Sequence, residues 1–192
     1  MTPVPLPLQN RLKWTLEEFE RLTDMGAFSG QKIELIEGDL VEKTSQNEPH
    51  ANGILLMQYK LLELFRRGYL VRVQLPMHIA NSKPEPDLSL VEGVPQGRIE
   101  IPLTALLVVE ISDMTLQTDR DVKSHIYARA RIAEYWIVNL NARQIEVRRD
   151  PRVDETAPLG WTYGSLQTLA ATDQISPLHS PDFTFSVADV LP

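Results

Sequence analysis

The chain has 192 residues, of which 43% are hydrophobic and 23% charged, and these values fit one soluble globular domain with a sizeable core. No apolar run reaches the roughly 18 residues of a membrane span, and the absence of cysteine excludes disulfides and thiolate metal sites and fits a cytoplasmic location. The net charge of −7 argues against tight non-specific binding to nucleic acid but leaves room for a locally basic groove.

The N-terminal region combines a proline-rich start with a helix signal. Residues 1–13 lack the apolar core of a signal peptide, and we expect them to be a flexible lead-in to a single domain that spans the chain. Thr15 followed by Glu18 is a capping-box pattern. Apolar residues then recur at helical spacing as far as Gly26, which predicts a helix over 15–25.

A hairpin and a longer helix follow. Residues 32–43 alternate apolar and acidic side chains around Gly38, and this pattern predicts a β-hairpin. Asn47 is a suitable N-cap, and Pro49 suits the first turn of a helix. The apolar stripe that comes next predicts a helix over 49–67.

The middle of the chain carries three predicted strands, and two acids stand at their ends. Residues 69–75 and 86–91 are rich in β-prone side chains, and Asp87 opens the second of these strands. Residues 105–110 form a nearly continuous apolar run that ends at Glu110, which is typical of a strand buried on both faces. Burying an acid in such a place is costly unless the acid has a partner.

The last third alternates between helix and strand. We expect a helix over 118–131, strands over 134–139 and 144–149, a further strand around Tyr163, and a last helical turn over 186–191. Helices and strands mixed in this order predict a single α/β domain with a mixed central sheet and helices on both of its faces.

Three charged side chains are the strongest candidates for a functional site. Asp87 and Glu110 stand at the ends of neighbouring strands, and two carboxylates placed so suit a hard divalent cation. Lys123 follows about one turn into the next helix, so we expect all three groups to converge. Simpler interpretations are open: Asp87 starts a strand after a proline, and Glu110 pairs with Lys123 only to hold the fold.

At Asp87, Glu110 and Lys123 the chain resembles the PD-(D/E)XK nuclease superfamily, and more closely the Uma-type family of putative restriction endonucleases. The matching segments are IELIEGDLVE at 33–42, His50, EPDLSLV at 85–91, LLVVEIS at 106–112 and DRDVKSHIYARARIAEYWIVNL at 119–140. One position departs from the superfamily pattern, because Ser112 stands where a lysine is expected two residues after the second acid. The resemblance implies a restriction-endonuclease-like fold in which this lysine has moved to Lys123.

The resemblance also implies an activity: a Mg²⁺-dependent or Mn²⁺-dependent endonuclease that hydrolyses phosphodiester bonds in DNA and acts as a homodimer. Asp87, Glu110 and the backbone carbonyl of Ile111 would hold the metal. Lys123, which we expect to be partly exposed, would orient or deprotonate the attacking water. The acidic net charge and the displaced lysine favour an alternative, a catalytically weak or inactive module that binds nucleic acid or a protein partner.

Four further residues are candidate contributors to the site: Glu34, His50, Ser112 and Gln117. Glu34 is either an additional acid of the site or a solvated acid of the hairpin, and His50 either faces the site from its helix or is exposed. The other two lie where they can contact a phosphate. We expect Asp119 and Asp121 to cap the third helix, because acids are favourable at a helix N-terminus.

Overall fold

The structure is a computed structural model, and it describes residues 12–43, 46–94 and 100–192. Most of the expected lead-in, residues 1–11, lies outside the described residues. At the end of that segment Lys13 forms an ion pair with Asp39, which ties the start of the described chain to the hairpin.

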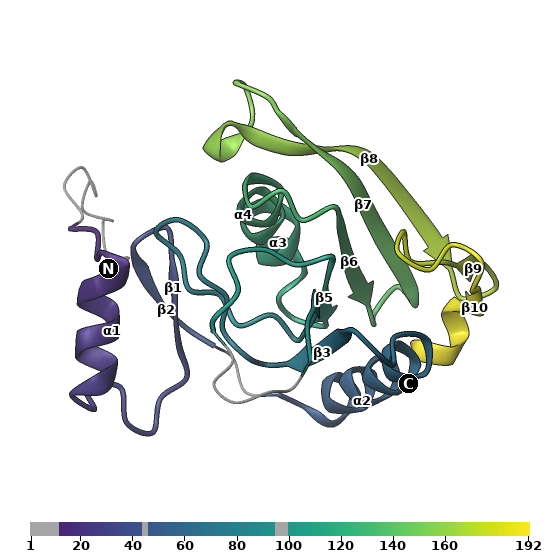
Figure 1. The fold of residues 1–192 in the computed structure, drawn as a ribbon, viewed down its shortest axis with the longest axis horizontal. Coiled ribbons are helices and arrows are strands. Elements are labelled where there is room, and N and C mark those ends of the chain that lie inside the picture. Colours follow the sequence, from purple (N-terminus) through teal and green to yellow (C-terminus); the bar gives the residue numbers. More distant parts are fainter. Residues whose placement is uncertain (1–11, 44–45, 95–99) are drawn as a thin grey trace, which may run out of the picture.

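A six-stranded sheet forms the centre of the fold (Figure 1), with its strands in the order β3, β4, β5, β6, β7 and β8. These strands are β3 (Tyr69–Val73), β4 (Leu88–Glu92), β5 (Leu107–Ser112), β6 (Glu134–Asn139), β7 (Gln144–Val153) and β8 (Trp161–Ala170). β5 and β6 run parallel, and the other neighbouring pairs run antiparallel. The prediction of a mixed central sheet is therefore confirmed.

β5 lies inside this sheet, and all of its residues are buried. This confirms the two-sided burial expected from the apolar run at 105–110. The strand begins and ends two residues later than predicted, because its parallel pairing with β6 continues to Ser112 opposite Asn139. β7 also extends beyond the predicted 144–149, because its pairing with β8 continues to Val153.

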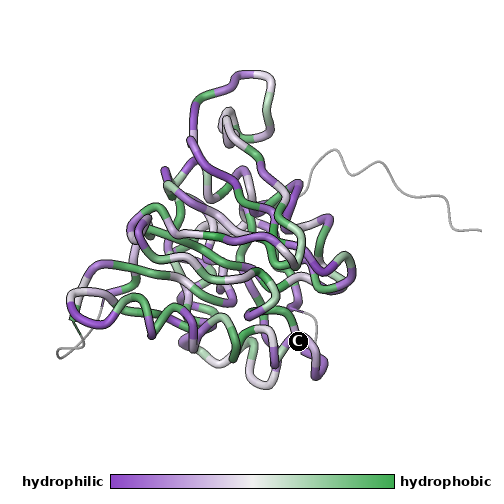
Figure 2. Tube along the Cα trace, turned by 90° about the vertical axis from the view of Figure 1, so that its right-hand side faces the viewer, coloured by the Kyte–Doolittle hydropathy of each residue, from purple (hydrophilic) through white to green (hydrophobic). Residues whose placement is uncertain are grey.

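Helices cover both faces of the sheet, as the sequence predicts. α2 (Glu48–Leu64) packs on one face, and the other face carries a continuous helical stretch made of α3 (Leu116–Thr118), the π-helical turn η1 (Asp119–Lys123) and α4 (Ser124–Arg129). Consecutive residues of β5 reach the two layers, because Val108 packs in the α4-side core and Val109 in the α2-side core. Figure 2 shows the hydrophobic stretches gathered in the middle of the molecule.

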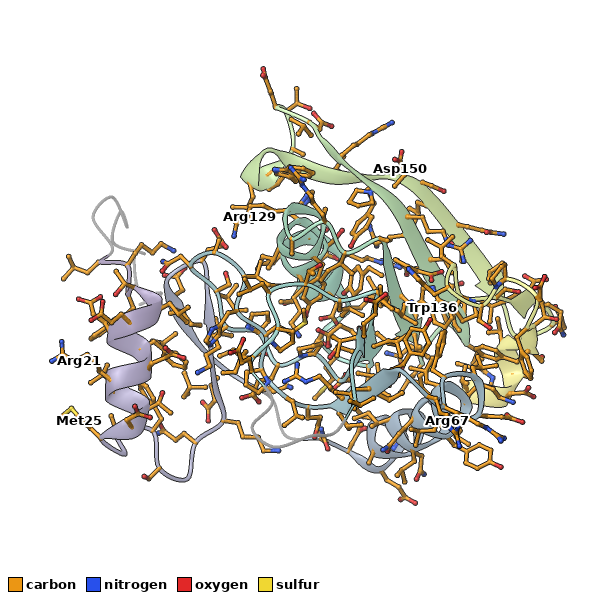
Figure 3. All side chains as sticks on the ribbon, viewed as in Figure 1. Arg21, Met25, Arg67, Arg129, Trp136 and Asp150 are labelled. Carbon is orange, nitrogen blue, oxygen red and sulfur yellow. The ribbon has the colours of Figure 1, made fainter. Side chains whose placement is uncertain are left out.

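The N-terminal elements follow the sequence pattern closely. α1 (Leu16–Asp24) has a capping box formed by Thr15 and Glu18, and Figure 3 shows Arg21 and Met25 pointing outward from it. The hairpin comprises β1 (Ile33–Ile36) and β2 (Asp39–Glu42). Glu37 and Gly38 form its two-residue turn with φ values of 49° and 81°. Positive φ at both positions is the type I′ geometry that matches the twist of a hairpin.

The remaining elements are short. They are η2 (Pro158–Gly160), β9 (Gln174–Ile175), β10 (Phe185–Ser186) and η3 (Val187–Val190). Ser186 caps η3 by accepting a hydrogen bond of 3.3 Å from the Ala188 N–H, which confirms the predicted last helical turn. α2 ends at Leu64, three residues early, because Phe65 turns into the core. Within the described residues, none of the helices has the length and apolar character needed to cross a membrane.

Gly53 allows α2 to pack tightly on β5. A Cβ at this position would lie 2.8 Å from Cγ2 of Ile111. We therefore expect Gly53→Ala to lower the free energy of unfolding by about 1–3 kcal/mol, although alanine favours a helix over glycine. Asn52→Ala, at an exposed position of the same helix, is the matched control. Thermal unfolding followed by circular dichroism measures both, and a Gly53→Ala protein as stable as the control would contradict the close approach.

Candidate active site

The alternation of side chains along β4 and β5 directs two acids to the same face of the sheet. Ile111 belongs to the α2-side core, so its neighbours Glu110 and Ser112 point to the opposite face. Leu88 of β4 also belongs to the α2-side core, so Asp87 points to that opposite face as well. The antiparallel register of β4 and β5 then places the two acids side by side, under the helical stretch that begins with α3.

Asp87 is held from several sides and is only 2% exposed. Its backbone N–H donates to Oε2 of Glu110 at 3.4 Å, and the Ile111 N–H donates to its Oδ2 at 2.9 Å. Gln74 donates its amide to Oδ1 at 3.2 Å, and Nε2 of His50 lies 3.0 Å from Oδ2. The carboxylate is therefore fixed in one orientation beside Glu110.

Lys123 meets the same acid from the helical layer. Its Nζ donates to Oε1 of Glu110 at 2.9 Å, and the Tyr127 hydroxyl donates to the same oxygen at 2.7 Å. Lys123 is only 7% exposed, so the expectation of a partly exposed lysine is wrong. The reason is that the helical stretch lies against the sheet and directs this side chain inward, between carboxylates.

Asp119 is a fourth charged group at this point, and it lies inside the π-helical turn. Its Oδ2 accepts hydrogen bonds from the hydroxyls of Ser112 at 2.9 Å and Thr115 at 2.8 Å, and its Oδ1 lies 3.6 Å from Nζ of Lys123. The expectation that Asp119 caps the third helix is therefore wrong. No side chain caps α3, and the Asp119 carboxylate points inward because the acid stands four residues before Lys123.

The structure separates the accessory candidates into two groups. Glu34 is 4% exposed and accepts a hydrogen bond of 2.6 Å from the Glu85 N–H, so it is not a solvated acid. Together with His50 it lies at the site. Ser112 is fully buried and donates a hydrogen bond to Asp119, Gln117 is exposed and contacts Asp121, and neither is among the residues that line the cavity at the site. Their contact with a phosphate stays a prediction.

These groups border a cavity of about 140 Å³. Its lining includes Glu34, His50, Asp87, Glu110, Asp119 and Lys123. A larger cavity of about 650 Å³ lies between β3, β4 and the segment that precedes β5, and none of these six residues lines it. The smaller cavity is therefore the candidate site, because it combines several carboxylates with a lysine and a histidine.

The electrostatics of Glu110 and Lys123 follow from burial and from mutual attraction. Burial raises the pKa of Glu110 to about 7, and the charges of Asp119 and Asp87 add to this effect while Lys123 opposes it. Burial lowers the pKa of Lys123, but the nearby carboxylates outweigh burial and hold that pKa well above its ordinary value. Lys123 is therefore protonated at neutral pH.

Asp87 and His50 form a second pair. Burial raises the pKa of Asp87, but the hydrogen bond and charge of His50 and the Ile111 N–H outweigh it, so that the pKa is lowered overall. For His50, burial lowers the pKa, and the hydrogen bond and charge of Asp87 turn the balance to a raised pKa. Asp87 is thus the fixed negative charge of the site, and His50 stabilises it.

The donor atoms at this point fit a hard divalent cation. Among the described residues, the Asp87 N–H is the one hydrogen-bond donor to Oε2 of Glu110, at a long 3.4 Å, and Asp87 is a buried anion. The Ile111 N–H faces Asp87, whereas the Ser112 carbonyl binds Leu140 on the β6 side. The backbone N–H and C=O of one strand residue point toward the same neighbouring strand. The Ile111 carbonyl therefore points to the side on which Asp87 lies.

This donor set is small. No three His, Asp or Glu side chains in the described ranges are gathered closely enough to form a metal site by themselves. Magnesium does not require such a cage, because it commonly binds one or two carboxylates and keeps several water molecules. Two carboxylates and a carbonyl are therefore sufficient protein ligands for it.

Glu110 also makes stability depend on pH. Its pKa of about 7 in the folded protein is above the ordinary value of 4.5, so it stabilises the fold fully below pH 4.5 and loses that contribution as pH rises through 7. We expect the free energy of unfolding of the wild type to fall by about 3 kcal/mol relative to Glu110→Gln over this interval, because one pKa unit corresponds to about 1.4 kcal/mol. Urea unfolding at pH 5, 6 and 7.5 measures the difference, and parallel pH profiles for the two proteins would contradict it.

Sequence reasoning missed three residues that hold the site together. Asp119 and Tyr127 stand four residues before and four residues after Lys123, and this spacing on a helix signals a shared face. Gln74 gave no signal, because it reaches Asp87 from the loop after β3 with a positive φ of 50°. The helical spacing could therefore have indicated Asp119 and Tyr127, whereas no sequence pattern indicated Gln74.

Comparison with known proteins identifies a family and a similar fold. Residues 16–188 match the model of the Uma2 family, whose description is putative restriction endonuclease. The fold is similar to a crystal structure of a putative nuclease belonging to DUF820 from Anabaena variabilis, with a TM-score of 0.70 and 15% sequence identity over 92% of this chain and 96% of that chain. None of the curated proteins matches the sequence.

The family match carries more weight than the structural likeness, because an identity of 15% supports a shared fold and no more. The matched segment contains all the elements that build the cavity with Asp87, Glu110 and Lys123. Membership in a family described in these terms supports a nuclease function. The chain belongs to the Uma2 family of putative restriction endonucleases.

Proposed function

We propose that this protein is a metal-dependent endonuclease that hydrolyses phosphodiester bonds in DNA, with Mg²⁺ or Mn²⁺ as its metal. One observation carries the proposal: Asp87, immediately before β4, lies beside Glu110 of β5, and the Lys123 ammonium group lies 2.9 Å from Glu110. Two acids and a lysine are the groups that metal-assisted hydrolysis of a phosphodiester uses. Family membership supports the same class of reaction.

In this proposal Asp87, Glu110 and the Ile111 carbonyl hold the metal. A divalent cation bound there supplies a polarised phosphoryl oxygen and a water with a lowered pKa. His50 and Gln74 hold Asp87 through its two carboxylate oxygens. Such contacts from residues outside the metal ligands fix ligand orientation, and their loss typically weakens metal binding.

Lys123 supplies a fixed positive charge. Burial lowers its pKa, yet the surrounding carboxylates keep the pKa raised, so the amine holds its proton at neutral pH. A protonated lysine cannot remove a proton from water. Of the roles considered for it, orientation of the attacking water and stabilisation of negative charge on the phosphoryl oxygens therefore fit best.

The remaining acids shape the charge of the cavity. Glu34 and Asp119 add buried carboxylates to those of Asp87 and Glu110, against the ammonium groups of Lys123 and of Lys43, which also lines the cavity. A cavity with this excess of negative charge attracts a divalent cation before it attracts a phosphate. A divalent cation held by these acids would supply the positive charge that a phosphodiester needs at this point.

The test is a cleavage assay on supercoiled plasmid, branched DNA and an RNA of matched sequence, with Mg²⁺, Mn²⁺ or EDTA. We expect nicking or linearisation of DNA with either metal and none with EDTA. Asp121→Asn is the control. It removes an exposed acid of the same helical stretch, and so it changes the net charge by the same amount as the substitution of one acid at the site.

The outcomes separate the two interpretations of the site. DNA cleavage that requires metal supports the endonuclease. Binding of DNA or a protein without cleavage under any of these conditions would favour the catalytically inactive module, in which Glu110 and Lys123 form a structural pair. Cleavage of RNA alone would move the substrate class from DNA to RNA.

Cutting both strands of a duplex is simplest with two active sites, so we propose that the protein acts as a homodimer. β3 and β8 are the edge strands of the sheet, and an edge strand offers backbone groups for pairing with a second chain. We expect light scattering at micromolar concentration to give twice the 21.8 kDa mass of one chain. A mass of one chain, with and without DNA, would contradict this prediction.

A further inference from the structure

Asp119 has one carboxylate oxygen without a hydrogen-bond partner among the described residues, although the residue is only 1% exposed. Its Oδ2 accepts hydrogen bonds from Ser112 and Thr115, whereas its Oδ1 accepts none from the part of the chain that the structure describes. Leaving a buried acceptor unsatisfied costs about 1–3 kcal/mol, and more when the group is charged. A buried oxygen of this kind calls for a function, and the Lys123 ammonium group is 3.6 Å away.

The fold holds Asp119 firmly. Ser112, the last residue of β5, and Thr115 bind its side chain, and the Tyr135 hydroxyl donates to its backbone carbonyl at 3.1 Å. The π-helical turn adds to this arrangement, because a π turn holds more residues than an α turn and keeps Asp119 and Lys123 on one face. Asp119 is therefore the fixed member of the pair, and the long side chain of Lys123 is the adjustable one.

Lys123 has one short hydrogen bond, to Oε1 of Glu110, and the Tyr127 hydroxyl shares that oxygen. Glu110 is also a candidate metal ligand. A cation bound by this carboxylate would withdraw electron density from the oxygen that holds the ammonium group and would repel the ammonium group itself. The lysine then needs a second anion, or it leaves the cavity.

We propose that Asp119 is a positioning residue that provides this second anion: its free Oδ1 receives the Lys123 ammonium group when Glu110 is engaged, and so keeps the lysine in the site. A movement of less than 1 Å converts the present 3.6 Å separation into a hydrogen bond. The consequence for catalysis rests on the proposed endonuclease function, but the transfer of the ammonium group does not.

Crystal structures of metal-free variants test the transfer directly. Glu110→Gln removes the charge that now holds Lys123, and we expect Nζ to move to within about 3.0 Å of Oδ1 of Asp119. In Glu110→Gln combined with Asp119→Asn, we expect the lysine to leave the cavity and become exposed. Nζ staying at the side chain of position 110 and beyond about 3.5 Å from Asp119 in the single variant would overturn the proposal.

Kinetics separate a positioning role from a structural one. Asp119→Asn should keep the contacts to the Ser112 and Thr115 hydroxyls while it presents an amide to Lys123. We expect kcat for DNA cleavage to fall about 100-fold, the effect of misplacing a reacting group by about 1 Å, with KM and Mn²⁺ affinity unchanged. Asp121→Asn is the matched control and should retain the wild-type kcat.

Three other outcomes of these experiments are also decisive. A loss of Mn²⁺ affinity in Asp119→Asn makes Asp119 a metal ligand and overturns the proposal. A lower melting temperature with unchanged kcat makes it a structural residue only and overturns it as well. If the wild type cleaves nothing, the endonuclease function fails, and the Glu110→Gln structure still decides where the ammonium group goes.

Discussion

Asp87→Asn is expected to abolish DNA cleavage, with a loss of about 1,000-fold or more. The substitution keeps the shape of the side chain but removes the anion that, in our proposal, binds the metal. A metal ion supplies several kcal/mol of transition-state stabilisation, and about 4 kcal/mol corresponds to 1,000-fold in rate. Plasmid cleavage and calorimetric titration with Mn²⁺ should show that activity and metal binding are lost together.

The electrostatics of Asp87 make this the most sensitive position. Burial raises its pKa, but His50 and the Ile111 N–H lower it overall, so the group is an anion at neutral pH and is held as one. An amide replaces it only in part: its oxygen can still accept from His50, but the negative charge that raises the pKa of His50 is lost, and the NH₂ group is a donor where the carboxylate had an acceptor. We expect the pKa of His50 to fall in the variant, which NMR titration of the imidazole measures.

The matched control for Asp87→Asn is His50→Gln. Glutamine retains a donor for the Asp87 carboxylate but removes the imidazole, so metal binding should weaken by about 10–100-fold, as for other residues that orient a ligand. Wild-type cleavage by Asp87→Asn would remove this acid from the mechanism. Equal and complete loss in both variants, with melting temperatures far below that of the wild type, would point to a role in folding alone.

The sheet was predictable because its strands carry a strong apolar signal. The run over 105–110 required burial on both faces, and β5 occupies the interior of the sheet with every residue buried. The strand predicted over 134–139 has the same bounds as β6. Strand ends were less predictable, because partner strands set them: the pairing of β5 with β6 runs to Ser112, which carries no strand signal of its own.

The candidate site was predictable where charge stood next to an apolar strand. Asp87, Glu110 and Lys123 stood out for that reason, and the structure brings Glu110 and Lys123 into direct contact. Asp119 was assigned to a helix cap because acids favour helix N-termini. The structure shows instead that its partners are Ser112, at the end of β5, and Thr115, in the turn between β5 and α3. An acidic residue near a predicted helix N-terminus does not indicate whether its side chain is exposed or buried against the sheet.

The burial of Lys123 changes what its removal should do. A partly exposed lysine costs little to remove, but Lys123 is 7% exposed and lies between Glu110 and Asp119. Lys123→Met keeps the aliphatic stem and leaves these acids without a cation. Breaking a buried ion pair from one side costs about 3–5 kcal/mol, so we expect a clear loss of stability at pH 8 in urea unfolding.

The loss should be smaller at low pH, and the sign follows from Glu110. Burial raises its pKa to about 7 even with the lysine present, and without the lysine we expect that pKa to rise further. A group with a raised pKa in the fold contributes its stability below the unfolded pKa and loses it as pH rises through the folded pKa. At pH 5 Glu110 is therefore neutral and needs no cation, so the loss in Lys123→Met should be limited to the contact of Lys123 with Asp119.

Cleavage by Lys123→Met should be lost at every pH where the protein is folded, while Mn²⁺ binding is kept or tightened, because removing a cation favours another cation at the same acids. Lys123→Arg should not restore cleavage, since a planar guanidinium does not fit the position of a compact ammonium group in this cavity. The two variants together give a sharp contrast. Metal binding without cleavage places Lys123 in the chemical step, whereas cleavage by folded Lys123→Met at pH 6 would leave the lysine as the structural partner of Glu110.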